Sequence, residues 1–517
     1  MARFFTPDVR RPTGPGPERD ARSELFQLVV THFLVPGALR APGGERSERF
    51  VALVRKLAVD DPEWTAGLIG WLRSQRPMRT VSHVAAAEYV KARTEGPAAD
   101  GPPGRSVVGS VLRRADEPGE LLAYWMARHG RALPKPLKRG LADAVTRLWN
   151  GRALLEYDDA TSGFRFGDIL SLVHAVPDPA KPWQRELFRY AVERRHRPDT
   201  ARPPAAVKDL AAHHALLALP VAARRAAVLE PGAVTRLAAL GLGAEEIVRL
   251  LQGAVDAAVW EALVPVMEPM ALVDQLCTFD RGGLGEAAAR GIAERIADPA
   301  RVARAGALPL HYLGVYQQTP SLHWSHALEQ ALGHALALVP RLPGRTLVLV
   351  DRSASMWSML MDGSRLTKAD AAAVFGIAVA MRAERADLVQ FGSSSAVVRF
   401  RPGEPVLVVL ERFVSMGGTH AAEALRERYR GHDRVIVVTD EPLGHRPGDS
   451  WQAAPAPGPG AAGTGAPVYS WHLAGRRSVR VPEPGAPRHY AFDGLSDDAF
   501  LMVPLLERGE RGDWPWQ

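Results

Sequence analysis

The chain has 517 residues, of which 46% are hydrophobic and 23% are charged, and its formal net charge is +7 at pH 7. This length exceeds the size at which one hydrophobic core usually stops growing, so we expect two or more domains. The single cysteine, Cys277, excludes an internal disulfide, and no stretch approaches the ~18 consecutive apolar residues of a membrane-spanning helix. We therefore expect a soluble, cytoplasmic protein with no membrane partner.

The positive charge comes almost entirely from arginine, because the chain holds 57 Arg and 7 Lys. Arginine makes bidentate phosphate contacts and stacks on bases, which would suit a nucleic-acid partner. A GC-rich coding sequence would produce the same bias. The local distribution of charge, rather than its total, must therefore carry any argument about nucleic acid.

The first two thirds of the chain have a helical pattern. Residues 1–22 lack the apolar segment of a secretory signal, and we expect a flexible tail there. Across residues 23–340, apolar residues recur at three- and four-residue steps, in segments separated by Gly, Pro or Asp. This pattern predicts an all-α domain of stacked, HEAT-like helix pairs with degenerate repeats.

Residues 341–517 change to short apolar runs that alternate with helical segments. Continuous apolar strands separated by helices predict a parallel, doubly wound α/β sheet. A Pro- and Gly-rich stretch at about 441–466 is too poor in apolar residues to pack, so we expect a flexible insertion there. The predicted strands are 346–350, 386–391, 396–400, 433–439 and 466–473, and the predicted helices are 368–385 and 419–430.

A group of oxygen-bearing side chains follows the first predicted strand. Asp351 ends that strand, and Ser353 and Ser355 come next at alternate positions. Thr419, after a Gly–Gly pair, and Asp440, at the end of another strand, add two more oxygens. Ligands of open parallel sheets bind at the carboxyl ends of the strands, and carboxylate and hydroxyl oxygens suit Mg²⁺. The sequence thus predicts a divalent metal site for Mg²⁺, with Mn²⁺ as the alternative ion.

Two other interpretations of these residues are open. A phosphatase-type aspartate nucleophile usually has a second acid two residues on, where this chain has Ser353, so hydrolysis is disfavoured and we expect no enzyme. The serines could instead cap the following helix. That interpretation leaves Thr419 and Asp440 unexplained.

A basic segment lies within the helical half. Residues 124–154 contain seven basic residues against one acid, Asp143. Lys135, Lys138 and Arg139 have the spacing of one helical face. Such a face can neutralise RNA phosphates without reading sequence, although a solvated helix face is the alternative. The candidate RNA-binding residues in this segment are Arg128, Arg131, Lys135, Lys138 and Arg139.

The oxygen-bearing group, from about Thr346 onward, resembles the metal-ion-dependent adhesion site of von Willebrand factor A domains, in which the metal binds a partner's carboxylate. Over nearly its full length the chain resembles the Ro autoantigen, or TROVE-domain, family, as a divergent bacterial member. That resemblance implies a monomeric ring of helical repeats whose two ends are joined by the A domain. The stretches that carry it are 131–145, 166–177, 307–319 and 322–336, in order and fused to the metal motif.

The Ro resemblance also implies a function. It implies a ribonucleoprotein of RNA quality control that captures 3′ ends of misfolded or structured small non-coding RNA through the ring and Y RNA on the outer face. It further implies an exoribonuclease partner such as polynucleotide phosphorylase. The alternative is a repeat scaffold that adheres to proteins through the metal and has no RNA role.

The outer-face site is the least complete part of the resemblance. His174 matches a histidine that contacts Y RNA in the family. Tyr157 and Thr161 stand where the family has basic residues, and Asp158 and Asp159 beside them are expected to repel phosphate.

Overall fold

The computed structural model describes residues 20–32, 45–74, 78–96, 100–159, 163–253, 255–319, 321–360, 365–441, 466–473 and 488–517. Most of the predicted tail and nearly all of the predicted insertion lie outside the described residues. Within the described part, no helix is both long enough and apolar enough to cross a membrane.

The described part of the first two thirds of the chain is helical. The helices are α1 (Ala21–His32), α2 (Glu45–Asp60), α3 (Pro62–Ser74), α4 (Arg79–Glu95), α5 (Gly104–Val111), α6 (Glu117–His129), α7 (Lys135–Leu148), α8 (Gly151–Tyr157), α9 (Phe166–Val173), α10 (Pro182–His196), α11 (Lys208–Leu217), α12 (Val221–Leu229), α13 (Ala233–Ala239), α14 (Ala244–Leu250), α15 (Ala257–Leu263), the 3₁₀ turn η2 (Val264–Val266), α16 (Pro269–Asp274), α17 (Leu276–Gly282), α18 (Glu286–Ala297), α19 (Pro299–Ala305), α20 (Pro309–Gln318) and α21 (Leu322–Leu336).

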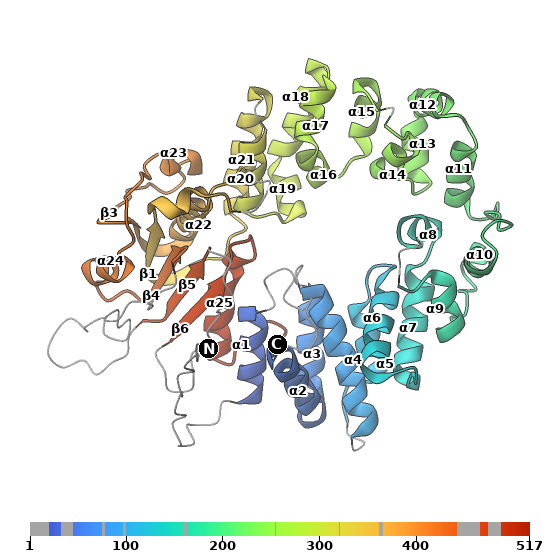
Figure 1. The fold of residues 1–517 in the computed structure, drawn as a ribbon, viewed down its shortest axis with the longest axis horizontal. Coiled ribbons are helices and arrows are strands. Elements are labelled where there is room, and N and C mark those ends of the chain that lie inside the picture. The colour runs from blue at the N-terminus through green and yellow to red at the C-terminus, as the bar shows by residue number, and fades with distance from the viewer. Residues whose placement is uncertain are drawn as a thin grey trace, which may run out of the picture.

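These helices follow one another around a circle, and the α/β part of the chain stands between its first and last members (Figure 1). Packing is mostly between near neighbours in sequence, such as α2 with α4, α5 with α7, and α18 with α21. This is the arrangement of a solenoid, in which each helix pair buries its apolar face on the next. The predicted HEAT-like helical ring is therefore confirmed.

The remainder of the chain forms a six-stranded sheet with strand order β3-β2-β1-β4-β5-β6. In β1, Val348 and Val350 face the core that holds α22, whereas Leu347 and Leu349 face the core that holds α24. Burial on both faces explains why residues 347–350 of this strand are all apolar. The elements are β1 (Leu342–Asp351), η3 (Ala354–Trp357), α22 (Lys368–Arg382), β2 (Ala383–Phe391), β3 (Ser395–Val397), α23 (Val406–Leu410), α24 (Ala421–Arg428), β4 (Arg434–Thr439), β5 (Val468–His472), β6 (His489–Asp493) and α25 (Ala499–Glu510).

The sheet confirms the predicted doubly wound class, with one correction. All the strand pairs are parallel except β2 with β3, which is antiparallel at the edge of the sheet. Only three residues separate Phe391 from Ser395, and a parallel crossover needs a dozen or more. Helix α22 also ends at Arg382, before its predicted end, because Ala383 already belongs to β2.

The C-terminal segment joins the first helices of the ring. Helix α1 packs on α25 and on β6, and the C-terminus lies beside α1 and α2 (Figure 1). Trp514 and Trp516 pack on Phe26, Trp64 and Trp71, with centroid separations of 5.2–5.9 Å between the two groups. We call these five residues the aromatic cluster. It ties the end of the α/β domain to the start of the ring.

Polar contacts tie the same domain to the other end of the ring. The Asp497 carboxylate accepts hydrogen bonds from the backbone N–H groups of Leu308 and Leu310, at 3.2 and 3.0 Å, where α20 begins. The Gln317 side chain of α20 donates to the Asp370 carboxylate of α22 at 3.2 Å. Both ends of the helical ring are thus anchored on the α/β domain.

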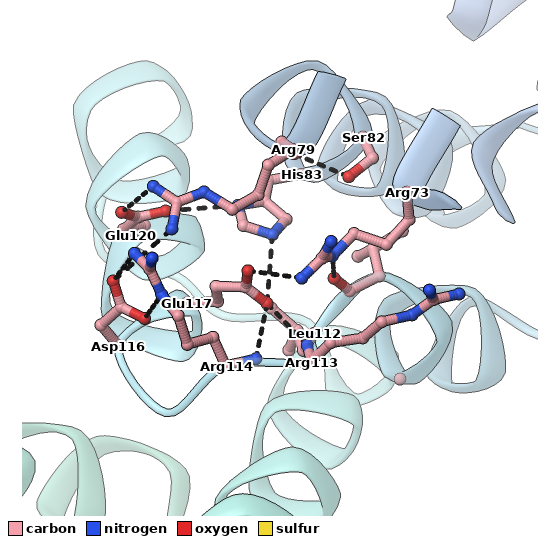
Figure 2. A network of polar contacts seen from close by, with 12 residues as sticks. Arg73, Arg79, Ser82, His83, Leu112, Arg113, Arg114, Asp116, Glu117 and Glu120 are labelled. Carbon is pink, nitrogen blue, oxygen red and sulfur yellow. Dashed lines mark hydrogen bonds and ion pairs between the residues drawn. The ribbon is translucent and has the colours of Figure 1, made fainter. Parts of the chain in front are cut away.

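A buried carboxylate holds together the helices near the start of the ring. Glu117, at the beginning of α6, accepts hydrogen bonds from Arg73 of α3 at 2.7 Å and from the backbone N–H groups of Arg113 and Arg114 at 2.6 and 2.9 Å. Figure 2 shows His83 of α4 pointing at the same carboxylate, 3.7 Å away. Burial favours the neutral acid, but the contacts from His83 and the two N–H groups outweigh it and lower the pKa of Glu117 to about 2.

This lowered pKa predicts a pH dependence of stability. The Glu117 contribution is present above an ordinary carboxyl pKa of about 4.5 and is lost as pH falls through about 2. We expect Glu117→Gln to lower the free energy of unfolding by about 1–3 kcal/mol at pH 7, because the half-buried Arg73 guanidinium loses its charged partner and the backbone N–H groups of Arg113 and Arg114 lose a charged acceptor. The deficit relative to wild type should shrink between pH 4.5 and pH 2, as followed by urea denaturation.

Glu120→Gln is the matched control, because Glu120 is more exposed and pairs with Arg79 at 3.0 Å on the surface. It should cost less than about 1 kcal/mol. Parallel pH profiles for wild type and Glu117→Gln would contradict the assignment.

Candidate metal centre and nucleic-acid interface

The predicted metal ligands meet where two central strands end. Strands β1 and β4 are parallel neighbours, with Val350 opposite Val438. Their next residues therefore emerge at the same edge of the sheet, which places Asp351 beside Thr439 and Asp440. This is the edge at which open parallel sheets bind ligands.

Asp351 is fully buried at this edge. One carboxylate oxygen, Oδ1, accepts from the backbone N–H of Ser353 at 2.7 Å, and Oδ2 accepts from the Thr439 hydroxyl at 2.5 Å. Burial raises the pKa of Asp351 to about 6, although the Thr439 and Ser353 hydrogen bonds oppose the shift, and the nearby Asp440 charge adds to it. Asp351 is a buried carboxylate whose hydrogen-bond donors, the Ser353 N–H and the Thr439 hydroxyl, are both neutral. It is therefore suited to bind a cation.

The two serines connect Asp351 to the second strand end. The Ser353 and Ser355 hydroxyls are 3.2 Å apart, and Ser355 donates to the Asp440 carboxylate at 2.7 Å. The Lys368 ammonium, at the start of α22, lies 3.5 Å from the other Asp440 oxygen. Four of the five predicted ligands therefore form one continuous hydrogen-bonded group.

The loop that carries Thr419 comes to the site by a different route. The Gly417 carbonyl accepts from the backbone N–H of Ala354 at 2.9 Å, and Met416 donates back to Arg352 at 2.9 Å. Gly417 has a φ of +80°, which favours glycine and lets this loop run beside the serines. Half-buried Thr419 follows two residues later. The loop is thus held next to Ser353, as its Gly–Gly pair predicted.

The donor set fits a hard divalent ion. The described residues include no cluster of three or more His, Cys, Asp or Glu side chains that could hold a metal, so a site here relies on hydroxyl oxygens. Two carboxylates with serine and threonine hydroxyls match Mg²⁺ or Mn²⁺ and do not match zinc. Sequence reasoning missed Thr439, although it directly precedes Asp440, and it missed Lys368, which no motif marks.

The basic residues of α7 share one face of that helix. Lys135 and Arg139 are exposed and Lys138 is half-buried, whereas Leu137 and Leu141 of the same helix are buried. No carboxylate of the described residues lies within 4 Å of the three cations or of exposed Arg131. The first turn of α7 also has no acidic side chain, so the positive end of the helix dipole adds to the same face.

Arg128 is placed differently from the α7 residues. It lies on α6 and makes two hydrogen bonds to Glu48, at 2.9 and 2.6 Å. Its Nε atom also lies 3.2 Å from the Glu88 carboxylate. Its charge is already compensated by two carboxylates. The structure therefore separates Arg128 from the other predicted RNA contacts, and no local sequence signal indicated these partners.

His174 is exposed, not packed among apolar residues. It caps α9 with a left-handed backbone, φ 53° and ψ 49°, and it lines a groove with Arg147 and Lys181. Asp143 and Asp178 line the same groove, and Arg147 donates its Nη2 to the backbone carbonyls that end α5. The groove is consequently mixed in charge rather than strongly basic.

The segment beside the expected outer-face site also differs from the prediction. Tyr157 lies under the Arg114 guanidinium, 5.3 Å from ring centroid to carbon. Asp158, expected to repel phosphate, is buried and paired with Arg165 and Arg194 at 2.8 and 3.0 Å. That expectation is wrong for Asp158, because two arginines neutralise it. Thr161 lies outside the described residues.

Fold and site together define a class of protein. It is a ring of helical repeats whose two ends are joined by an A-type α/β domain with a candidate metal centre at its strand ends.

The crystal structure of the Deinococcus radiodurans RO (RSR) protein has a similar fold. It is similar with a TM-score of 0.70 and 19% sequence identity, over 96% of this chain and 100% of that chain. The likeness confirms the fold expected from the Ro resemblance. Neither the protein-family models nor the curated protein sequences give a match to this chain.

Proposed function

We propose that this protein binds structured or misfolded small non-coding RNA, and docks a protein partner through a divalent metal in its A-type domain. The observation that carries the RNA part is the α7 face, on which Lys135, Lys138 and Arg139 lie with no carboxylate of the described residues nearby. Its place on a ring with the Ro fold supports capture of RNA ends within a quality-control ribonucleoprotein.

The protein in this proposal is a binder and not an enzyme. A bound Mg²⁺ would present an open coordination position to a partner carboxylate, and an exoribonuclease such as polynucleotide phosphorylase is the partner class that the Ro fold suggests. Y RNA at the His174 groove is a weaker part of the proposal, since that groove has mixed charge.

A protein-only scaffold is the second candidate. It is favoured by the pairing of many arginines, including Arg105 with Asp143 and Arg128 with Glu48. If most basic side chains serve the fold, the arginine excess says nothing of RNA. Salt dependence separates the two functions, because phosphate neutralisation releases counterions and docking through one carboxylate does not.

The experiment is the triple variant K135Q/K138Q/R139Q. Because each phosphate contact adds roughly 0.7 to the slope of log affinity against log salt for a single strand, we expect the slope to fall by about 2. At ~150 mM salt the affinity should fall by about 10- to 100-fold. Fluorescence anisotropy with a labelled hairpin that carries a single-stranded 3′ extension measures both quantities.

The charge-matched control is R189Q/R236Q/R290Q, which removes three exposed arginines that form surface ion pairs elsewhere on the ring. It should change affinity less than threefold. Equal affinity and equal slope for wild type and the α7 variant would contradict the RNA-binding role of this face. Absence of any salt-dependent binding by wild type would favour the protein-only scaffold.

A further inference from the structure

Three exposed apolar side chains lie close in sequence to the predicted metal ligands. Trp357, Met359 and Val414 are 41%, 53% and 55% exposed. Trp357 and Met359 follow Ser355 in the loop after β1, and Val414 precedes Gly417 in the loop that reaches Ser353. The loops that carry the predicted ligands thus also carry exposed apolar side chains, which a docked partner would cover.

Arg352 holds the Trp357 indole in position. It is buried, donates to the Ala369 carbonyl at 2.8 Å, and lies 3.7 Å from Asp370. Its guanidinium carbon is 4.6 Å from the Trp357 ring centroid and 5.6 Å from that of Phe413. A cation–π contact on one face holds the indole in place, so covering its other face costs little side-chain entropy.

The charges around the candidate metal centre favour a negatively charged ligand. A divalent ion would balance Asp351 and Asp440, and Lys368 adds one positive charge 3.5 Å from Asp440. The mouth is then left with a positive charge and an open metal position, which a carboxylate completes. A phosphate would satisfy the charge equally, but the aliphatic Met359 and Val414 offer no stacking surface for bases, whereas they suit apolar side chains.

We propose that this surface docks a protein segment in which an Asp or Glu stands next to a large apolar side chain. The acid completes the metal, and the apolar side chain covers Trp357, Met359 and Val414. This inference rests on the proposed metal-dependent docking and adds the second half of the recognition element. Tryptophan in a preorganised position is the residue type that most often dominates interface energetics.

The test selects peptides from a randomised display library on the full-length protein with Mg²⁺, with counter-selection on Asp351→Ala. We expect enriched sequences that contain an acid adjacent to Phe, Trp, Leu or Met. An enriched peptide, once synthesised, should bind the protein at least tenfold more weakly when a chelator is present. The same loss is expected when the acid of the peptide is replaced by its amide, or when the protein carries Trp357→Ala. Val414→Ser, in the other loop, should weaken it several-fold, and Trp357→Phe should restore most binding.

Calorimetric titration with MgCl₂ separates this inference from the metal site itself. Wild type and Trp357→Ala should bind Mg²⁺ equally. Lack of Mg²⁺ binding by wild type would overturn the metal site and this inference with it. Normal Mg²⁺ binding with no enrichment, or enrichment of acids without apolar neighbours, would overturn this inference alone. A loss of labelled single-stranded RNA binding in Trp357→Ala would assign the surface to nucleic acid instead.

Discussion

Trp514→Ala is expected to destabilise the junction between the ring and the α/β domain by about 3–5 kcal/mol, the usual cost of removing a large buried aromatic side chain. Trp514 is 5% exposed and contacts fully buried Phe26 at a centroid distance of 5.3 Å. Its loss leaves a cavity between α1, α3 and the C-terminal segment. Hydrogen exchange should show faster opening of α1 and α25, while β1 and β4 keep their protection.

Adding an atom to the aromatic cluster should destabilise the junction, as removing an indole does. A Cβ added to Gly67 would collide with the Trp516 indole, so Gly67→Ala is expected to cost about 1–3 kcal/mol at the same junction. Trp357→Ala is the control for loss of an indole, because its side chain lies on the A-type domain and is partly exposed. Unchanged exchange of α1 in both Trp514→Ala and Gly67→Ala would show that the aromatic cluster does not hold the junction.

Asp351→Ala is expected to weaken Mg²⁺ binding by more than about 100-fold, because loss of an outer-shell partner alone typically costs 10- to 100-fold. Asp440→Ala should weaken Mg²⁺ binding by a similar factor, and it would also remove the carboxylate that pairs with Lys368. Thr439→Val should show the smaller, outer-shell effect, since Thr439 donates to the Asp351 carboxylate at 2.5 Å. Titration calorimetry with MgCl₂ and MnCl₂ gives this graded series.

Asp387→Asn is the matched control, because this carboxylate is in the middle of β2, four residues before the strand ends at Phe391, and pairs with Arg345 and His432 instead of the predicted ligands. It should bind Mg²⁺ like wild type. RNA affinity of Asp351→Ala should remain within about twofold of wild type, since the α7 face is on a different domain. Undiminished Mg²⁺ binding in both Asp351→Ala and Asp440→Ala would place the metal elsewhere.

Much of the candidate metal centre could be predicted from the sequence because its geometry is local or follows from strand order. Alternate residues after a strand lie close together by chain connectivity, as Asp351, Ser353 and Ser355 do. A second buried strand that also ends in an acid, Asp440, meets them once the sheet is parallel. Helical periodicity likewise predicted the ring, since each helix buries one face on near neighbours in sequence.

The remainder depended on contacts between distant residues, which leave no local pattern. Strand β6, His489–Asp493, was not predicted, because its sequence HYAFD begins and ends with a polar residue and lacks the run of β-branched side chains that marks the other strands. The pairing of Arg128 with Glu48 spans 80 residues, and nothing near either residue indicates it. The burial of Asp158 beneath Arg165 and Arg194 could not be predicted either, because the local sequence is typical of an exposed acidic loop.

The aromatic cluster has a consequence for the newly made chain. Phe26 and Trp64 leave the ribosome well before the indoles that cover them, because 450 residues separate Trp64 from Trp514. At 5–20 residues per second the early helices wait roughly 20–100 s for their cover. During that interval the nascent protein exposes an uncovered aromatic surface, so we expect its yield in the cell to depend on chaperones and on uninterrupted translation.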